Sequence, residues 1–88
     1  MKDTYILAKM YGIDYHLIAT QTSVASPITA INAFGIIVTE KDYKYKSKAF
    51  HEAGRLISSH LEQHAQSHNQ DTANHARESL QKLALLLI

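Results

Sequence analysis

Three histidines recur at intervals of four residues, at His60, His64 and His68. Side chains four residues apart lie on the same face of an α-helix, and paired imidazoles at that spacing can bind zinc or nickel. The same stretch also carries Gln63 and Gln66, which is typical of a polar helical surface. The sequence therefore predicts no dedicated metal site, with these three histidines as weak candidates.

A second group with chemical potential is His51-Glu52, followed by Arg55. In the zinc-peptidase motif HExxH, two histidines one turn apart bind zinc and the glutamate activates a water molecule. The string AFHEAGRLISSHL resembles the AYHEAGHA region of FtsH-type peptidases, but Arg55 stands where the second ligand would be. A guanidinium stays charged and cannot coordinate a metal. We therefore expect no catalytic residues, no cofactor and no enzymatic activity.

The segment Lys41–Lys48 (KDYKYKSK) combines four lysines with two tyrosines. Lysine can contact phosphates, and tyrosine can add hydrogen bonds or stacking on nucleic acid. The alternative is a solvated first turn of a helix with Tyr43 facing the core. The net charge of only +1 weakens a nucleic-acid reading, because such domains usually carry a clear basic excess.

The elements that must position these residues begin with Thr4–Ser23, where the spacing predicts a helix-turn-helix. Thr4 is the expected N-cap, Ala8 is small where two helices would cross, and Gly12 suits a turn residue with positive φ. The remaining aliphatic positions of the pattern are Leu7, Ile13 and Ile18. Residues 13–20 also alternate with period two, which leaves a buried strand open as the alternative.

Residues 27–39 permit two structures. Ser26-Pro27 can begin a short helix that Gly35 closes, since proline is favoured at the first helical position. Alternatively, two strands form a hairpin, or wing. The three β-branched residues Ile36–Val38 favour a strand there.

Residues 40–66 are expected to form one long helix, and residues 71–88 a second helix that packs against it. Thr39 and Asp42 have the spacing of a capping box, and Asp71 or Thr72 is the expected cap of the last helix. The facing apolar residues recur at helical intervals. They are Tyr43, Phe50, Ala53, Ile57 and Leu61 on the first helix, and Ala73, Ala76, Leu80, Leu83 and Leu87 on the second.

The end of the chain is apolar on more than one side, because Leu86 and Ile88 are expected to point away from the stripe of the last helix. An apolar terminal turn usually meets a partner or a second copy. The sequence therefore predicts a homodimer, with an interface made of Leu83, Leu86, Leu87 and Ile88.

Length and composition indicate one domain over residues 1–88, mainly α with a possible small β-hairpin wing. The chain has no cysteine, which is compatible with a reducing cytoplasm. No leader peptide is evident, and the longest apolar run, Leu83–Ile88, is far too short to span a membrane. We expect a cytoplasmic protein that does not insert into membranes.

The order of helix-turn-helix, possible hairpin and Thr39-Glu40-Lys41-Asp42 resembles small winged-helix DNA-binding proteins of the MerR and excisionase type, over about half the chain. The resemblance implies a recognition helix at Asp14–Gln21 in the major groove and a C-terminal helix that pairs two subunits. The sequence departs from the family in having no Arg or Lys within Asp14–Gln21, where Leu17 would be partly exposed. The predicted DNA-contacting residues are Lys9, Tyr15, His16, Thr20, Gln21, Lys41, Lys44, Lys46 and Lys48.

The leading functional prediction is thus a small DNA-binding transcriptional regulator. The alternative is a protein-binding factor or inhibitor, of the kind that phages and other mobile elements encode, acting through Leu83–Ile88 or the tyrosines. A third possibility is a metal-binding protein that uses the histidine face.

Overall fold

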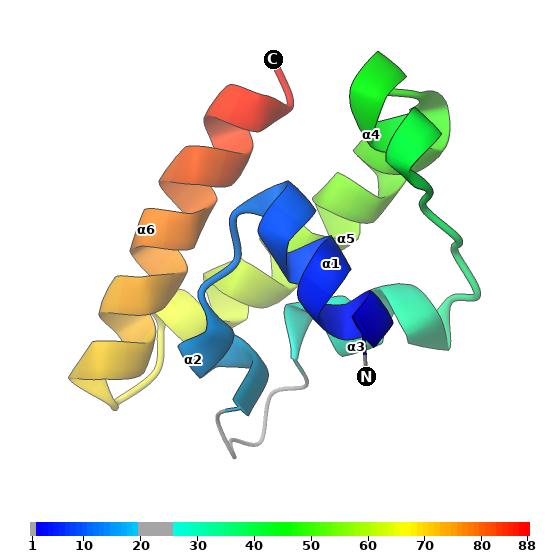
Figure 1. Cartoon of the computed structure of the whole chain (residues 1–88). Coiled ribbons are helices and arrows are strands. Elements are labelled where there is room, and N and C mark those ends of the chain that lie inside the picture. Colours follow the sequence, from blue (N-terminus) through cyan, green and yellow to red (C-terminus); the bar gives the residue numbers. More distant parts are fainter. Residues whose placement is uncertain (1, 20–25) are drawn as a thin grey trace.

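The computed structural model describes residues 2–19 and 26–88, and all regular secondary structure in these ranges is helical (Figure 1). The prediction of a mainly α fold is confirmed, and the described residues contain no β-wing. The elements are α1 (Lys2–Tyr11), α2 (Tyr15–Ala19), α3 (Pro27–Ala33), α4 (Glu40–Tyr45), α5 (Lys48–Ala65) and α6 (Gln70–Leu86).

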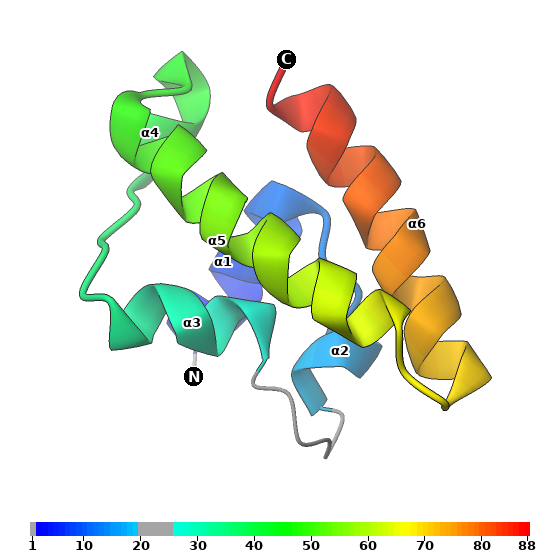
Figure 2. The same ribbon diagram turned by 180° about the vertical axis from the view of Figure 1, so that it is seen from behind.

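Helices α5 and α6 form the predicted helical hairpin (Figures 1 and 2). Helices α3 and α4 also pack on α5, whereas α1 and α2 pack on α3 and α6. The predicted stripes meet as expected: Ala53, Ile57 and Leu61 of α5 are fully buried. On α6, Ala73, Ala76 and Leu83 are buried, whereas Leu80 and Leu87 are partly buried. The remaining core side chains come mainly from α1, α2 and α3, namely Leu7, Ala8, Tyr11, Ile13, Leu17, Ile28 and Ile31, with Phe50 from α5.

The turn after α1 follows the predicted spacing, because Gly12 has φ +68° and the Ile13 amide donates to the Ala8 carbonyl over 2.8 Å. Residues 15–19 form a helix, so the strand alternative is wrong there. The predicted register is also wrong: Leu17 is fully buried, whereas Ile18 is only partly buried. The reason is that α2 packs mainly on α6 and α3, which places Leu17 against the core.

Two residues predicted as N-caps do not cap their helices in the structure. Helix α1 already includes Thr4, so that residue is inside the helix rather than at its cap. Helix α6 begins after Asn69, whose side-chain oxygen accepts a hydrogen bond from the Thr72 amide over 3.1 Å. Asn69 is the preferred cap because its short amide reaches the third helical residue. Asp71 then lies in the first turn, where its charge complements the helix dipole.

The predicted long helix over residues 40–66 is wrong, because it is broken at Lys46 and Ser47 into α4 and α5. Lys46 adopts a left-handed conformation, with φ 47°, and Ser47 caps α5 by accepting from the Phe50 amide over 3.3 Å. The capping box at the start of α4 is confirmed, since Thr39 and Asp42 bond each other's backbone amides at 2.9 and 3.2 Å. Asp42 also accepts the Ser47 hydroxyl over 2.7 Å, and thus holds both helix starts.

Residues 27–39 take the helical alternative at their start. Pro27 is the first residue of α3, and the Ser26 hydroxyl accepts from the Ile28 amide over 3.3 Å. The strand predicted for Ile36–Val38 is wrong: after Gly35, at φ +69°, these residues form an irregular connection to α4. In the described structure no neighbouring strand pairs with these residues, and β-propensity stabilises a strand only when it packs in a sheet.

The chain end closes over α5 at Gly54, because a side chain on this glycine would lie only 2.8 Å from Leu87. Leu83 is fully buried and Leu86 is partly buried against the core, so the prediction that Leu86 points away is wrong. Ile88, by contrast, is 88% exposed and Leu85 is 72% exposed. Much of the predicted dimer interface is therefore occupied within one chain.

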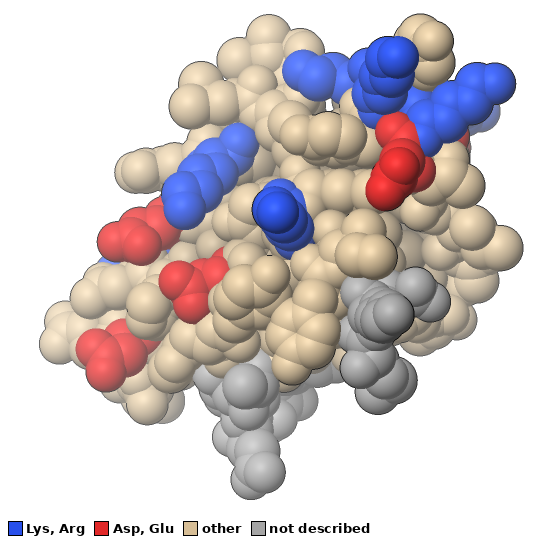
Figure 3. Space-filling model, viewed as in Figure 1, with Lys and Arg blue, Asp and Glu red and all other residues tan. Residues whose placement is uncertain are grey.

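Charged side chains are unevenly distributed over the face seen in Figure 1. Figure 3 shows the basic groups over α4, the end of α1 and the upper part of α6, whereas most acidic groups lie lower down, over α6. Among the helices of the described residues, none combines the length and apolar character needed to cross a bilayer.

Candidate binding groove

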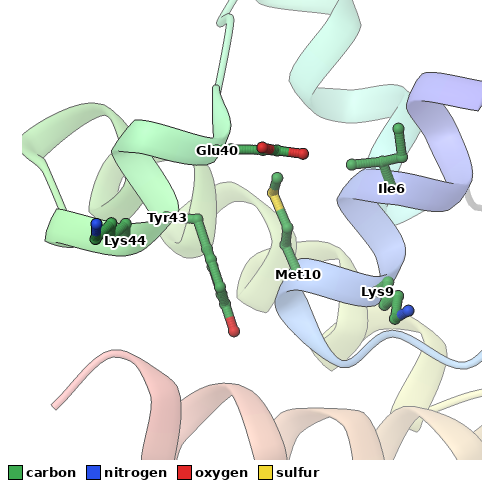
Figure 4. Close-up of a pocket in the computed structure, with 6 residues that line it drawn as sticks. All are labelled: Ile6, Lys9, Met10, Glu40, Tyr43 and Lys44. Atoms are coloured by element: carbon green, nitrogen blue, oxygen red, sulfur yellow. The ribbon is translucent and has the colours of Figure 1, made fainter.

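A hollow of about 590 Å³ lies between α1 and α4 (Figure 4). Each wall contributes three side chains with the same spacing, which puts them on one helical face. They are Ile6, Lys9 and Met10 from α1 and Glu40, Tyr43 and Lys44 from α4. We call this the α1–α4 groove.

The middle of the groove is apolar and rests on the core. Met10 is partly buried against the core cluster, and the Tyr43 ring packs edge-on against Phe50, with 5.7 Å between ring centroids. Ile6 is nevertheless 45% exposed and Tyr43 is 41% exposed. An apolar ligand would therefore find exposed apolar surface on Ile6 and Tyr43, beside a Met10 that packs on the core.

A buried tyrosine fixes α1 relative to this site. Tyr11 stacks on Phe50 with 4.7 Å between ring centroids, and its hydroxyl donates to the Phe50 carbonyl over 3.0 Å. Burial raises the pKa of the Tyr11 phenol far above its usual range, and the negative charge of Asp42 raises it further. The hydroxyl thus stays protonated as a donor, and α1 remains attached to the start of α5.

A second, smaller hollow of about 290 Å³ continues the apolar surface on the other side of Ile6. It is lined by Ile6, Leu7, Asn32, Ile36, Ile37 and Val38. Ile37 is 80% exposed. Because Ile6 lines both hollows, the apolar surface extends from α4 across α1 to the segment that joins α3 and α4.

The charged residues of the α1–α4 groove lie at its margins. Figure 4 shows Lys44 and Lys9 at opposite outer sides, with Tyr43 and Met10 between them and Glu40 beside Met10. Neither lysine forms an ion pair within residues 2–19 and 26–88; Lys44 lies over the Tyr45 ring, 5.6 Å from its centroid. The groove therefore has an apolar middle with single charged side chains at its margins.

The predicted DNA-contacting residues do not form one surface. Lys9 and Lys44 line the groove, and Lys41, Lys46 and Lys48 are exposed around α4. Tyr15 and His16 lie on α2, at the opposite end of the molecule in both ribbon views. Thr20 and Gln21, with the rest of 20–25, lie outside the described residues.

Helix α2 is engaged with α6 rather than presented as a free recognition helix. The His16 ring stacks on His75 with 4.6 Å between centroids, and its Nε2 lies 3.4 Å from the Thr72 hydroxyl. Asp14, just before α2, lies 3.0 Å from His75 Nδ1, and its amide donates to Ser79. On its other side, Tyr15 packs against Tyr5 with centroids 5.2 Å apart.

The predicted histidine face is wrong in its geometry. Helix α5 ends at Ala65, so His68 lies beyond it, and His64 is turned into the core. His60 Nδ1 lies 3.1 Å from the Leu56 carbonyl of its own helix. Within the part of the chain that the structure describes, no three ligand-type side chains are close enough to hold a metal ion. His51 Nδ1, similarly, lies 3.0 Å from the Ser47 carbonyl.

Sequence reasoning identified the two lysines of the groove but missed Ile6, Met10, Glu40 and Tyr43 as partners in one site. The i, i+3, i+4 spacing places the residues of each wall on one helical face, but it does not indicate that the two faces adjoin. No protein-family model, curated protein or solved structure matches this chain.

Proposed function

We propose that this chain is a small, non-enzymatic protein-interaction module that binds a segment of another protein in the α1–α4 groove. The observation that carries the proposal is the exposed apolar middle of the groove, where Ile6, Met10 and Tyr43 line one hollow and Tyr43 packs on the buried Phe50. Apolar hollows with a few polar groups at their margins are typical binding sites. The absence of cysteine is compatible with action in a reducing compartment such as the cytoplasm.

DNA binding through α2 receives less support from the same geometry. Much of the affinity for DNA comes from lysine and arginine side chains that contact phosphates beside the helix in the groove of DNA. Here the lysines of α4 lie at the other end of the molecule from α2, whose neighbouring residues include Asp14 and His75. The lysines alone remain compatible with weak phosphate contacts, so DNA belongs in the test as a competing ligand.

The experiment is a selection of displayed random peptides on the purified full chain, followed by affinity measurements on individual peptides. Ile6→Gln should weaken selected peptides about ten- to a hundredfold, because burial of an isoleucine contributes roughly 1.5–3 kcal/mol. Leu85→Gln is the matched control, since Leu85 is an exposed aliphatic residue on α6.

Two results would refute the proposed function. One is a selection that yields no binding peptide, and the other is a set of peptides that Ile6→Gln and Leu85→Gln affect equally. Fluorescence anisotropy with a labelled duplex of random sequence at physiological salt tests the competing ligand. Tight binding to this duplex would favour the DNA-binding prediction instead.

A further inference from the structure

We infer that α4 is a detachable flap, which opens and unfolds locally while the other helices of the described structure stay folded. The flap comprises residues 39–46 and forms one wall of the α1–α4 groove. Opening removes this wall, so the groove alternates between a walled and an unwalled form. The motion needs no ligand, and it is therefore a property of the fold beyond the proposed function.

The flap contributes no side chain to the buried core. None of the residues of α4 is buried, and within residues 39–46 every side chain except that of Asp42 is exposed. Tyr43 packs edge-on against Phe50, with 5.7 Å between ring centroids, but is itself 41% exposed. The hollow on the other side of α4 separates it from α1. A segment with so few buried apolar contacts opens at a lower cost than the whole fold.

The elements on either side of the flap end independently of it. On the side of α3, the Ile36 amide donates to the Ile31 carbonyl over 3.2 Å, and both Ile36 and Val38 are partly buried against the core. On the side of α5, Ser47 accepts from the Phe50 amide and so caps that helix whether or not α4 is docked. Detachment of the flap therefore leaves α3 and α5 with their own terminal hydrogen bonds.

The bonds that close the flap are few and lie at its end. Asp42 accepts the Ser47 hydroxyl over 2.7 Å, and the Ser47 amide donates to the Asp42 carbonyl over 3.1 Å. Water can replace both partners when α4 moves away. A helix of six residues is too short to persist without packing, so α4 unfolds when it detaches and its amides become open to exchange.

The test is native-state hydrogen exchange, followed by NMR, on the full chain without ligand. The amides of Lys46 and Ser47 report on the flap, since they donate to Tyr43 and Asp42, and amides in the middle of α5 report on global unfolding. Ile57→Val destabilises the core, where Ile57 is fully buried. It should accelerate exchange in α5 about two- to tenfold and leave the flap amides unchanged, because the core stays folded while the flap opens.

A matched pair of tyrosines tests what holds the flap closed. Tyr43→Ala removes the contact with Phe50 and should accelerate exchange of the flap amides about tenfold, after correction for intrinsic rates. Tyr45→Ala makes the same substitution in the same helix, but Tyr45 is 67% exposed. Its effect should be less than about threefold.

Three results would overturn the inference. If Ile57→Val accelerated the flap amides by the same factor as the amides of α5, the flap would open only when the whole chain unfolds. Equal effects of Tyr43→Ala and Tyr45→Ala would show that Phe50 does not hold α4. Flap amides without any protection would mean that no closed form exists. Circular dichroism verifies that each variant is folded, and all these measurements are independent of the peptide selection that tests the proposed function.

Discussion

At the scale of single residues, Asp42 is the side chain with the most structural connections around the groove. One carboxylate oxygen accepts from the backbone and hydroxyl of Thr39, and the other accepts from Ser47, which caps α5. These hydrogen bonds hold the pKa of Asp42 below its usual value; the Thr39 amide contributes most, followed by the Ser47 and Thr39 hydroxyls. The charged form of Asp42 therefore supports both α4 and α5.

We predict that Asp42 makes the fold sensitive to acid. Because the pKa is lower in the folded chain than the value of 3.8 expected when unfolded, the stabilisation is fully present above about pH 4. It is lost as the pH falls through the lowered folded pKa, where the carboxylate is protonated. Urea denaturation at a series of pH values should show this loss in the native chain and a smaller one in Asp42→Asn.

The control for this experiment is Glu62→Gln, which neutralises an exposed carboxylate in the last turn of α5. Its acid dependence should match that of the native chain. If Asp42→Asn and Glu62→Gln had identical profiles, the hydrogen bonds of Asp42 would not be responsible for the pH dependence.

At the scale of the helices, the apolar periodicity of the sequence predicted the α5–α6 hairpin, but the break between α4 and α5 was not predicted. The apolar repeats of Ala53–Ile57–Leu61 and Ala73–Ala76–Leu83 predicted the α5–α6 hairpin, because burial of one face imposes a 3.6-residue period. The break at Lys46 was missed because a lysine in a left-handed conformation has no sequence signal comparable to glycine. A short helix such as α2 was equally ambiguous, since its form depends on packing against α6.

The left-handed Lys46 predicts a stabilising substitution. Lys46→Gly should raise the free energy of unfolding by roughly 0.5–1 kcal/mol, since glycine adopts positive φ without steric cost. The matched control is Lys44→Gly, which places glycine inside α4 and should lower stability by up to about 1 kcal/mol. Chemical denaturation measures both variants, and a destabilising Lys46→Gly would contradict the left-handed link between α4 and α5.

At the scale of the whole molecule, the candidate site was largely invisible in the sequence. Lys9 and Lys44 were singled out for their charge, but the groove forms only when α1 and α4 are brought together by the core. Tyr11 of α1 bonds Phe50 of α5, which is 39 positions away in the chain. Tyr43 of α4 packs against the same Phe50 ring. Local periodicity contains no information on such pairings, so Ile6 and Tyr43 could not be assigned to one site.

The predicted homodimer can be tested at Leu85, whose exposure separates an effect on association from an effect on folding. Leu86 is partly buried against the core, so Leu86→Glu should lower the melting temperature whether or not a dimer forms. Leu85 is 72% exposed, so Leu85→Glu should leave the melting temperature unchanged. Sedimentation velocity then decides the oligomeric state: if this end pairs two chains, Leu85→Glu should shift a native dimer to monomer, and a native chain that is monomeric at high concentration would exclude the interface.

The long-range contacts of the first two helices have a consequence for how the chain acquires its structure during synthesis. Asp14 bonds Ser79, 65 positions later, and His16 contacts Thr72, 56 positions later. Contacts of such separation form slowly, because a long loop must first be closed. While α6 is still within the ribosome, α1 and α2 lack one of their packing surfaces, and their apolar residues are open to chaperones. We therefore infer that the N-terminal half of this fold is completed only after α6 has emerged.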